Sequence, residues 1–174
     1  MMDNPGQLGA DQVADAVAGI AGYPVPLILI DMGTATTASV VNSKKQYVGG
    51  MILPGVGVSL DALTARASQL SGISIDAPRH VIGKNTIECM KSGVLLQQCS
   101  SSGWNIDRIE EELGEKATVV ATGGLGKEKS FPIVKEKSFW MRNFFWVSDW
   151  SRICSNGHIL MGCISLAGCR TSKW

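Results

Sequence analysis

The stretch Leu27-Ile28-Leu29-Ile30-Asp31-Met32-Gly33-Thr34-Ala35-Thr36-Thr37 decides the fold of this chain. Its apolar run predicts a buried strand, and the Asp-x-Gly-Thr that follows predicts a turn at the end of that strand. At such a turn Asp31 can hold a cation or a water molecule, Gly33 lets the backbone approach an anion, and the Thr34 hydroxyl can donate a hydrogen bond. The stretch therefore favours phosphoryl transfer, although an ordinary β-turn between two strands fits the same residues.

The pattern on both sides of this stretch predicts an α/β domain. Apolar periodicity and capping residues predict four helices, which begin near Ala10-Asp11, after Gly57, at Asn85 or Thr86, and near 106. Strands are expected at 27–31, 36–41, 47–53 and 118–121, and the glycine pair Gly123-Gly124 follows the last of them. No internal repeat is visible.

The composition is that of a protein with one hydrophobic core. The chain has 174 residues, of which 45% are hydrophobic, and no apolar run approaches the ~18 residues that span a membrane. A basic region typical of a signal peptide is absent at the N-terminus. Five cysteines without paired spacing indicate a reducing compartment. We therefore expect a cytoplasmic protein without a membrane or nucleic-acid partner.

Charge and aromatic residues divide the chain near residue 126. Residues 1–126 contain 8 basic and 12 acidic side chains, a net charge of −4, whereas residues 127–174 contain 8 basic and 3 acidic ones, a net charge of +5. All five tryptophans, all four phenylalanines and four of the five cysteines lie within 96–105 or 129–174. This division suggests that two kinds of sequence have been joined.

Codon reading offers an explanation for both aromatic patches. Tryptophan has one codon, so it constrains the neighbouring frames. In one displaced frame 97–104 can read N-S-A-A-A-V-D-G, followed by Ile or Met. In another frame 129–146 can read I-I-P-H-C-K-R-E-I-I-L-D-E-K-L-L-L-G, a helical pattern. We infer a frameshift that is repaired around 96–105 and an unrepaired one near Glu128, which makes 129–174 out of frame.

A series of short motifs resembles the second half of the type III pantothenate kinases. In order, the motifs are Asp3-Asn4-Pro5, Leu8-Gly9-Ala10-Asp11, the Asp31 stretch, Gly49-Gly50-Met51-Ile52-Leu53-Pro54-Gly55, Ile82-Gly83-Lys84-Asn85-Thr86, Ser92-Gly93 and Ala121-Thr122-Gly123-Gly124-Leu125. Each string is short, but their order and spacing together are specific. The resemblance implies one ribonuclease-H-like lobe of the actin-like fold shared by actin, acetate and sugar kinases and Hsp70, with the N-terminal lobe missing. Residues 1–126 would be the C-terminal lobe, and 127–174 an aberrant, poorly ordered tail.

The resemblance also implies an activity and its residues. The expected reaction is the ATP-dependent phosphorylation of pantothenate to 4'-phosphopantothenate, the first step of coenzyme A synthesis, with Mg²⁺ and either K⁺ or NH₄⁺ as cofactors. Asp11 matches the family's general base, and the substrate would contact Gly9, Ala10, Asp11, Gln12 and Thr86. Asp31 matches the ligand of the monovalent cation, and Gly33 and Thr34 match nucleotide contacts. In the family, the threonine that Thr86 matches reaches the pantothenate pocket of the neighbouring subunit, which implies a homodimer.

Some features depart from the family and leave other functions open. Gln12 stands where the family has an arginine, and Met2 where a substrate-binding tyrosine is usual. Together with the missing lobe, these departures predict that this chain is inactive. One alternative is a non-catalytic binding or regulatory relative of the Bvg accessory factor type. The other is a different actin-like kinase or phosphatase, which the Leu-Gly-Ala-Asp and Ile-Gly-Lys-Asn-Thr motifs disfavour.

Overall fold

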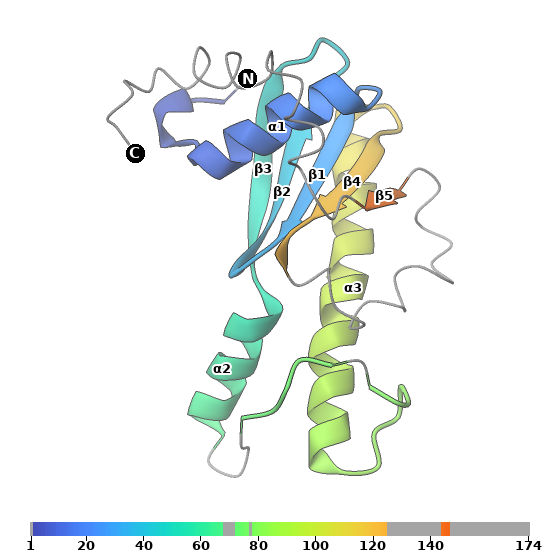
Figure 1. Ribbon diagram of the computed structural model, residues 1–174. Helices are drawn as coiled ribbons and strands as arrows, with labels where there is room; N and C mark the ends of the chain where they lie inside the picture. Colours follow the sequence, from blue (N-terminus) through green and yellow to red (C-terminus); the bar gives the residue numbers. More distant parts are fainter. Residues whose placement is uncertain (1, 68–71, 77, 125–143, 147–174) are drawn as a thin grey trace.

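The computed structural model describes residues 2–67, 72–76 and 78–124, together with the backbone of 144–146. These residues form a five-stranded sheet with α1 on one face and α3 on the other (Figure 1). Along the chain, a short 3₁₀ helix (Pro5–Gln7) is followed by α1 (Ala10–Gly22), β1 (Leu27–Met32), β2 (Ala35–Val41), β3 (Tyr47–Pro54), α2 (Val56–Arg66), α3 (Thr86–Leu113), β4 (Thr118–Thr122) and β5 (Phe144–Trp146).

The sheet has the order β3-β2-β1-β4-β5. Strand β2 is antiparallel to both of its neighbours, whereas β1 is parallel to β4 and β4 is parallel to β5. Four strands therefore run in one direction and β2 alone runs against them. This order and polarity are those of the ribonuclease-H-like fold, so the predicted fold class is confirmed.

Strand β1 lies in the middle of the sheet and is covered on both faces. Ile28 and Ile30 belong to a core cluster with residues of α2 and α3, whereas Leu27 and Leu29 pack on the other face with Ala16 of α1. All four side chains are at most 2% exposed. A strand buried on both faces has to be apolar at successive positions rather than at alternate ones. This requirement explains why the apolar run shows no alternation.

Helix α3 corrects the sequence-based expectation. Two helices were expected between Thr86 and Leu113, but α3 is one continuous helix of 28 residues. It begins at the N-cap Asn85, whose Oδ1 accepts a hydrogen bond from the Glu88 amide at 2.9 Å, and it ends at Gly114, which has a φ of 71°. No proline interrupts it. The patch at 96–105 therefore lies inside α3.

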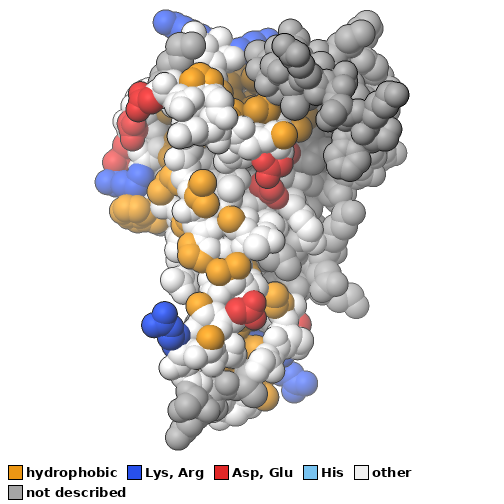
Figure 2. All heavy atoms as spheres, turned by 90° about the vertical axis from the view of Figure 1, so that its left-hand side faces the viewer, with side chains coloured by type: hydrophobic (Ala, Val, Ile, Leu, Met, Phe, Trp, Pro, Cys, Tyr) orange, Lys and Arg blue, Asp and Glu red, His pale blue; other side chains and the backbone are white. Residues whose placement is uncertain are grey.

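The side of the molecule formed by β3 and α2 carries several exposed apolar side chains. Figure 2 looks onto this side and shows hydrophobic side chains scattered along its height. Among them Ile52 of β3 is 76% exposed, and Val58 and Leu63 of α2 are 41% and 38% exposed. Helix α2 ends at Arg66. None of the helices in the described part of the chain is both long and apolar enough to cross a membrane.

The predicted aberrant tail, 127–174, lies outside the described residues except for β5. The backbone of β5 pairs with β4, with Val119 opposite Phe144 and Ala121 opposite Trp146. The division of the chain into a lobe and a tail thus stays a prediction.

Candidate active site

The first turn of α1 organises the Leu-Gly-Ala-Asp motif. Gly9 is the N-cap, and its amide donates a hydrogen bond to Oε1 of Gln12 at 3.3 Å. The Gln12 amide donates to Oδ1 of Asp11 at 2.9 Å. A Cβ atom at Gly9 would collide with the Asp11 carboxylate. The motif therefore presents Asp11 as an exposed carboxyl group in the first turn of α1.

The turn between β1 and β2 holds the other predicted site residues. Asp31 lies at the end of β1, opposite Thr37 of β2 and Thr122 of β4. Beyond it, the Gly33 amide donates to the carbonyl oxygen of Ala35 at 3.1 Å. The Thr34 carbonyl oxygen accepts from the amide of Gly55 at 3.1 Å, and the Thr34 side chain is exposed.

Three glycine motifs gather at this end of the sheet. Because β1, β3 and β4 run in the same direction, their carboxyl ends lie along one edge, where open α/β sheets bind ligands. Gly55 follows β3, and an added Cβ would collide with the carbonyl oxygens of Gly33 and Thr34. Gly123 follows β4 with a φ of 115°, and a Cβ there would collide with the backbone of Met32. The backbone is thus packed closely around the end of β1.

A third carboxylate, Asp15, joins Asp11 and Asp31. Burial raises the pKa of Asp15 to about 7, with smaller contributions from the negative charges of Asp31 and Asp11. Burial also raises the pKa of Asp31, and the charge of Asp11 adds to that effect. Of the ion pairs formed within the described residues, none involves these three side chains. The start of α1 and the end of β1 therefore form one acidic cluster that lacks a cationic partner there.

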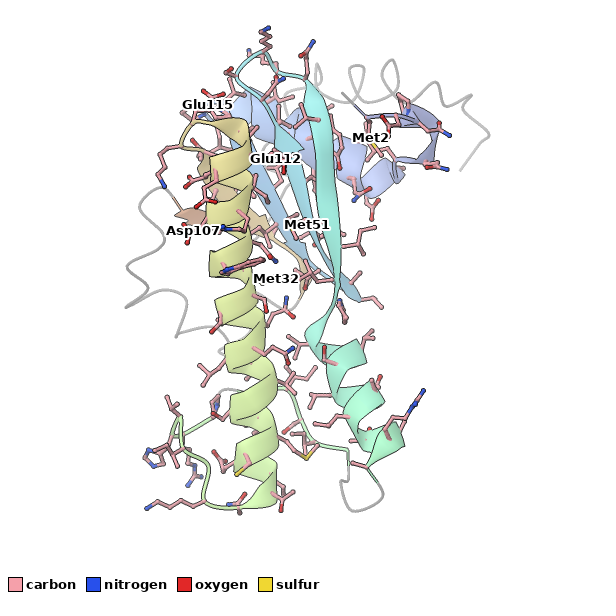
Figure 3. The ribbon with its side chains drawn as sticks, turned by 180° about the vertical axis from the view of Figure 1, so that it is seen from behind. Met2, Met32, Met51, Asp107, Glu112 and Glu115 are labelled. Carbon is pink, nitrogen blue, oxygen red and sulfur yellow. The ribbon has the colours of Figure 1, made fainter. Side chains whose placement is uncertain are left out.

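Sequence reasoning overlooked Asp15, although a signal was present. Asp15 lies four residues after Asp11, and positions i and i+4 share one face of a helix. Gln12 was singled out in the sequence because it stands where the family has a charged arginine. In the structure, its side-chain oxygen accepts the hydrogen bond from the amide of the N-cap Gly9. Met2 is half-buried and lies beside α1 (Figure 3).

Thr86 is not brought together with the other predicted residues within one chain. It is the exposed first residue of α3, and this end of α3 lies well beyond the sheet (Figure 1). Asn85, rather than Thr86, supplies the capping oxygen. Within one chain, Asp11 and Thr86 thus lie at the starts of two different helices, α1 and α3.

The donor set fits a monovalent cation better than a divalent one. Within the described residues, no three His, Cys, Asp or Glu side chains converge as a metal site would require. Asp31 is a single carboxylate followed by a turn of backbone and hydroxyl oxygens. Weakly charged oxygen donors of this kind suit K⁺ or NH₄⁺, whereas Mg²⁺ is usually held by carboxylates together with substrate phosphates.

The sheet has the ribonuclease-H-like strand order, and a carboxylate and two glycine turns lie at the carboxyl ends of its parallel strands. Together these features define one lobe of an actin-like α/β protein. Residues 1–102 match the family model described as type III pantothenate kinase. The chain belongs to the type III pantothenate kinase family.

Individual relatives agree with this assignment. A type III pantothenate kinase from Bacillus cytotoxicus is 44% identical over 125 residues, which cover 72% of this chain and 48% of that protein. One from an Exiguobacterium species is 46% identical over 126 residues, which cover 72% and 49%. The chain thus spans about half the length of these relatives. It also resembles the crystal structure of a conserved putative Baf family transcriptional activator from Campylobacter jejuni, with a TM-score of 0.49 and 18% identity over 91% of this chain and 64% of that one.

Proposed function

We propose that this chain supplies one side of the active site of an enzyme that transfers the γ-phosphate of ATP to pantothenate and yields 4'-phosphopantothenate. The observation that carries the proposal is that Asp31 lies at the glycine-lined end of the sheet, where the charge of Asp11 acts on it. The family to which the chain belongs supports the choice of substrates. The free thiols Cys89 and Cys99 in the described part support a reducing, cytoplasmic location.

Asp11 is the proposed general base. Its Oδ1 accepts the Gln12 amide, and Oδ2 accepts no hydrogen bond from the described residues, so Oδ2 is available to the primary hydroxyl of pantothenate. The carboxylate takes the hydroxyl proton as the hydroxyl oxygen attacks the γ-phosphorus, and ADP leaves. The step does not need an unusually strong base, because phosphoryl transfer depends mainly on positioning and charge stabilisation.

The end of β1 is the proposed cation and nucleotide contact. Asp31 would hold K⁺ or NH₄⁺, and Gly33 and Thr34 would contact the phosphates of ATP and its Mg²⁺. The cations would supply positive charge that offsets the charge of the phosphates. The close backbone packing at Gly55 supports this role, because it fixes the turn before any ligand binds.

Thr86 is proposed to complete the pantothenate site of a second subunit in a homodimer. Its distance from the acidic cluster within one chain supports a contact between subunits. The surface around it is also apolar, since Val81, Ile82 and Ile87 are 69%, 81% and 49% exposed. Apolar side chains at this exposure are suited to burial against a partner.

The second candidate is a non-catalytic, ligand-binding relative. The observation that favours it is Gln12, whose amide oxygen is engaged in the helix cap and which carries no charge to hold a carboxylate or phosphate. Such a protein would bind pantothenate or nucleotide at the same sheet end without transferring a phosphate.

A chimera separates the two candidates. The first half of the Bacillus cytotoxicus relative would be joined to this chain with 97–105 and 129–174 restored in frame, and pantothenate phosphorylation and pantothenate binding would both be measured. We expect ATP-dependent phosphorylation that Asp11→Asn abolishes, because the substitution removes the proton acceptor and preserves the shape. Binding without phosphorylation would favour the non-catalytic candidate. A near-normal kcat for Asp11→Asn would refute the role of Asp11.

A further inference from the structure

The inner face of α3 is polar where the fold requires apolar side chains. Gln98, Ser102 and Asn105 are each 6% exposed. Their neighbours Leu95 and Ile106 belong to the core cluster that packs on Ile28 and Ile30 of β1. These three polar side chains therefore occupy the strip of α3 that faces the sheet.

The polar groups on this strip are poorly satisfied. The side-chain amides of Gln98 and Asn105 form no hydrogen bond with any residue that the structure describes. The Ser102 hydroxyl donates only to the carbonyl oxygen of Gln98, one turn earlier in the same helix, at 2.9 Å. Buried polar groups without partners destabilise a fold, because they lose their hydrogen bonds to water.

A small cavity lies beside two of these side chains. It has a volume of about 10 Å³ and is lined by Ser102 and Asn105 together with apolar residues that include Ile28, Ile30 and Ile109. A space of this size holds one water molecule at most. The packing between α3 and β1 is thus incomplete at the two positions where α3 is polar.

In the displaced reading frame, the buried positions 102 and 105 can carry apolar residues. Moved by one base, the codons of Ser102 and Asn105 can read as Val and Ile, which suit buried positions. In the same frame Trp104, whose side chain is 61% exposed, has to read as Gly. The displaced frame can therefore place apolar residues at the buried positions 102 and 105, and it removes a large aromatic residue from the surface at 104. At 98 the same frame reads Ser in the string given above, so it leaves that position polar.

We infer that residues 97–105 are translated from a reading frame displaced by one base, and that they leave a packing defect between α3 and β1 at Ser102 and Asn105. The helix persists because its backbone hydrogen bonds do not depend on the side chains and no proline occurs in the patch. Leu95 and Ile106, on either side of the patch, hold α3 against the sheet.

The first test is the nucleotide sequence of the gene. Across 97–105, we expect the frame displaced by one base to contain no stop codon and to read an apolar residue at both 102 and 105. A polar residue at either position, or a stop codon, would overturn the inference.

The second test measures stability in the full chain by pulse proteolysis in urea and by thermal unfolding at low protein concentration. Ser102→Val with Asn105→Ile fills the buried positions, and Gln97→Ile with Ser100→Val makes comparable changes at exposed positions of the same helix. We expect the buried pair to raise Tm by about 5–10 °C and the exposed pair to leave it within about 2 °C. An unchanged or lower Tm for the buried pair would overturn the inference, because it would show that the polar side chains are satisfied where they are.

Discussion

Replacing Asp15 with asparagine is expected to stabilise the protein at alkaline pH and to have little effect at acidic pH. The pKa of Asp15 is raised from 3.8 to about 7, which is a shift of about 3 units. At ~1.36 kcal/mol per unit the shift corresponds to about 4 kcal/mol for a fully buried group. Because Asp15 is only partly buried, solvent screening reduces the expected effect to about 1–2 kcal/mol.

The direction follows from the protons that each state binds. Between pH 4 and 7 the folded protein keeps a proton on Asp15 that the unfolded chain has lost, so the free energy of unfolding falls as the pH rises. The Asp15 contribution is therefore fully favourable below about pH 4 and is lost as the pH passes through about 7. Asparagine resembles the protonated acid at every pH, so the variant avoids this loss.

The assay is pulse proteolysis in urea on the full chain at pH 5 and pH 8, with Asp61→Asn as the control, since Asp61 is exposed on α2. We expect the Asp15 variant to gain about 1–2 kcal/mol relative to the unmodified chain at pH 8 and less than half of that at pH 5. The control is expected to change stability equally at both pH values. If Asp15→Asn has the same effect at pH 5 and pH 8, burial does not raise the pKa of Asp15 as described.

Three further substitutions test other features. Gly123→Ala is expected to lower the free energy of unfolding by about 1–3 kcal/mol, because its φ of 115° and its contact with the Met32 backbone both exclude a Cβ. Gly124 has no neighbouring atom within 4 Å, so Gly124→Ala should lower the free energy of unfolding less in the same urea titration. Ile28→Ala removes a fully buried core side chain and should lower the free energy of unfolding by about 2–5 kcal/mol, whereas Ile82→Ala, at an 81% exposed site, should lower it by about 0.5 kcal/mol or less. Equal urea midpoints for the two variants would contradict the core assignment. In the chimera, Asp31→Ala should weaken the dependence of phosphorylation on K⁺, and an unchanged K⁺ titration would assign the cation to other ligands.

Four of the five strands were predictable because their signals are local, whereas β5 was not expected from the sequence. The apolar run marks β1, and the Asp-x-Gly-Thr sequence marks the turn after it, each within a few residues. The predicted strand ended at Asp31, and β1 in the structure is one residue longer and ends at Met32. The long α3 was not predictable in the same way. Its apolar periodicity is interrupted at Gln98, Ser102 and Asn105, which suggested two helices, whereas backbone hydrogen bonding continues through these positions.

The candidate site was predictable only in part. Asp11, Asp31 and Gly33 stood out through motifs, because glycine and carboxylate occur there in a recognisable order. Asp15 belongs to no such motif, and its importance arises from burial and from a charge contributed by a different element. Such properties depend on tertiary structure, so the sequence alone could not reveal the shifted pKa.

The length of α3 has a mechanical consequence. Its 28 residues extend about 42 Å, and Asn105, near the sheet, lies about 28 Å along the axis from Thr86. A helix of this kind acts as a lever arm, because a tilt of about 5° at Asn105 displaces Thr86 by about 2.5 Å. Val56 and Leu60 of α2 belong to the same core cluster as Met90 and Val94 near that end of α3. The position of Thr86 thus depends on how closely the side chains of α3 pack against the sheet near Asn105, more than four helical turns away.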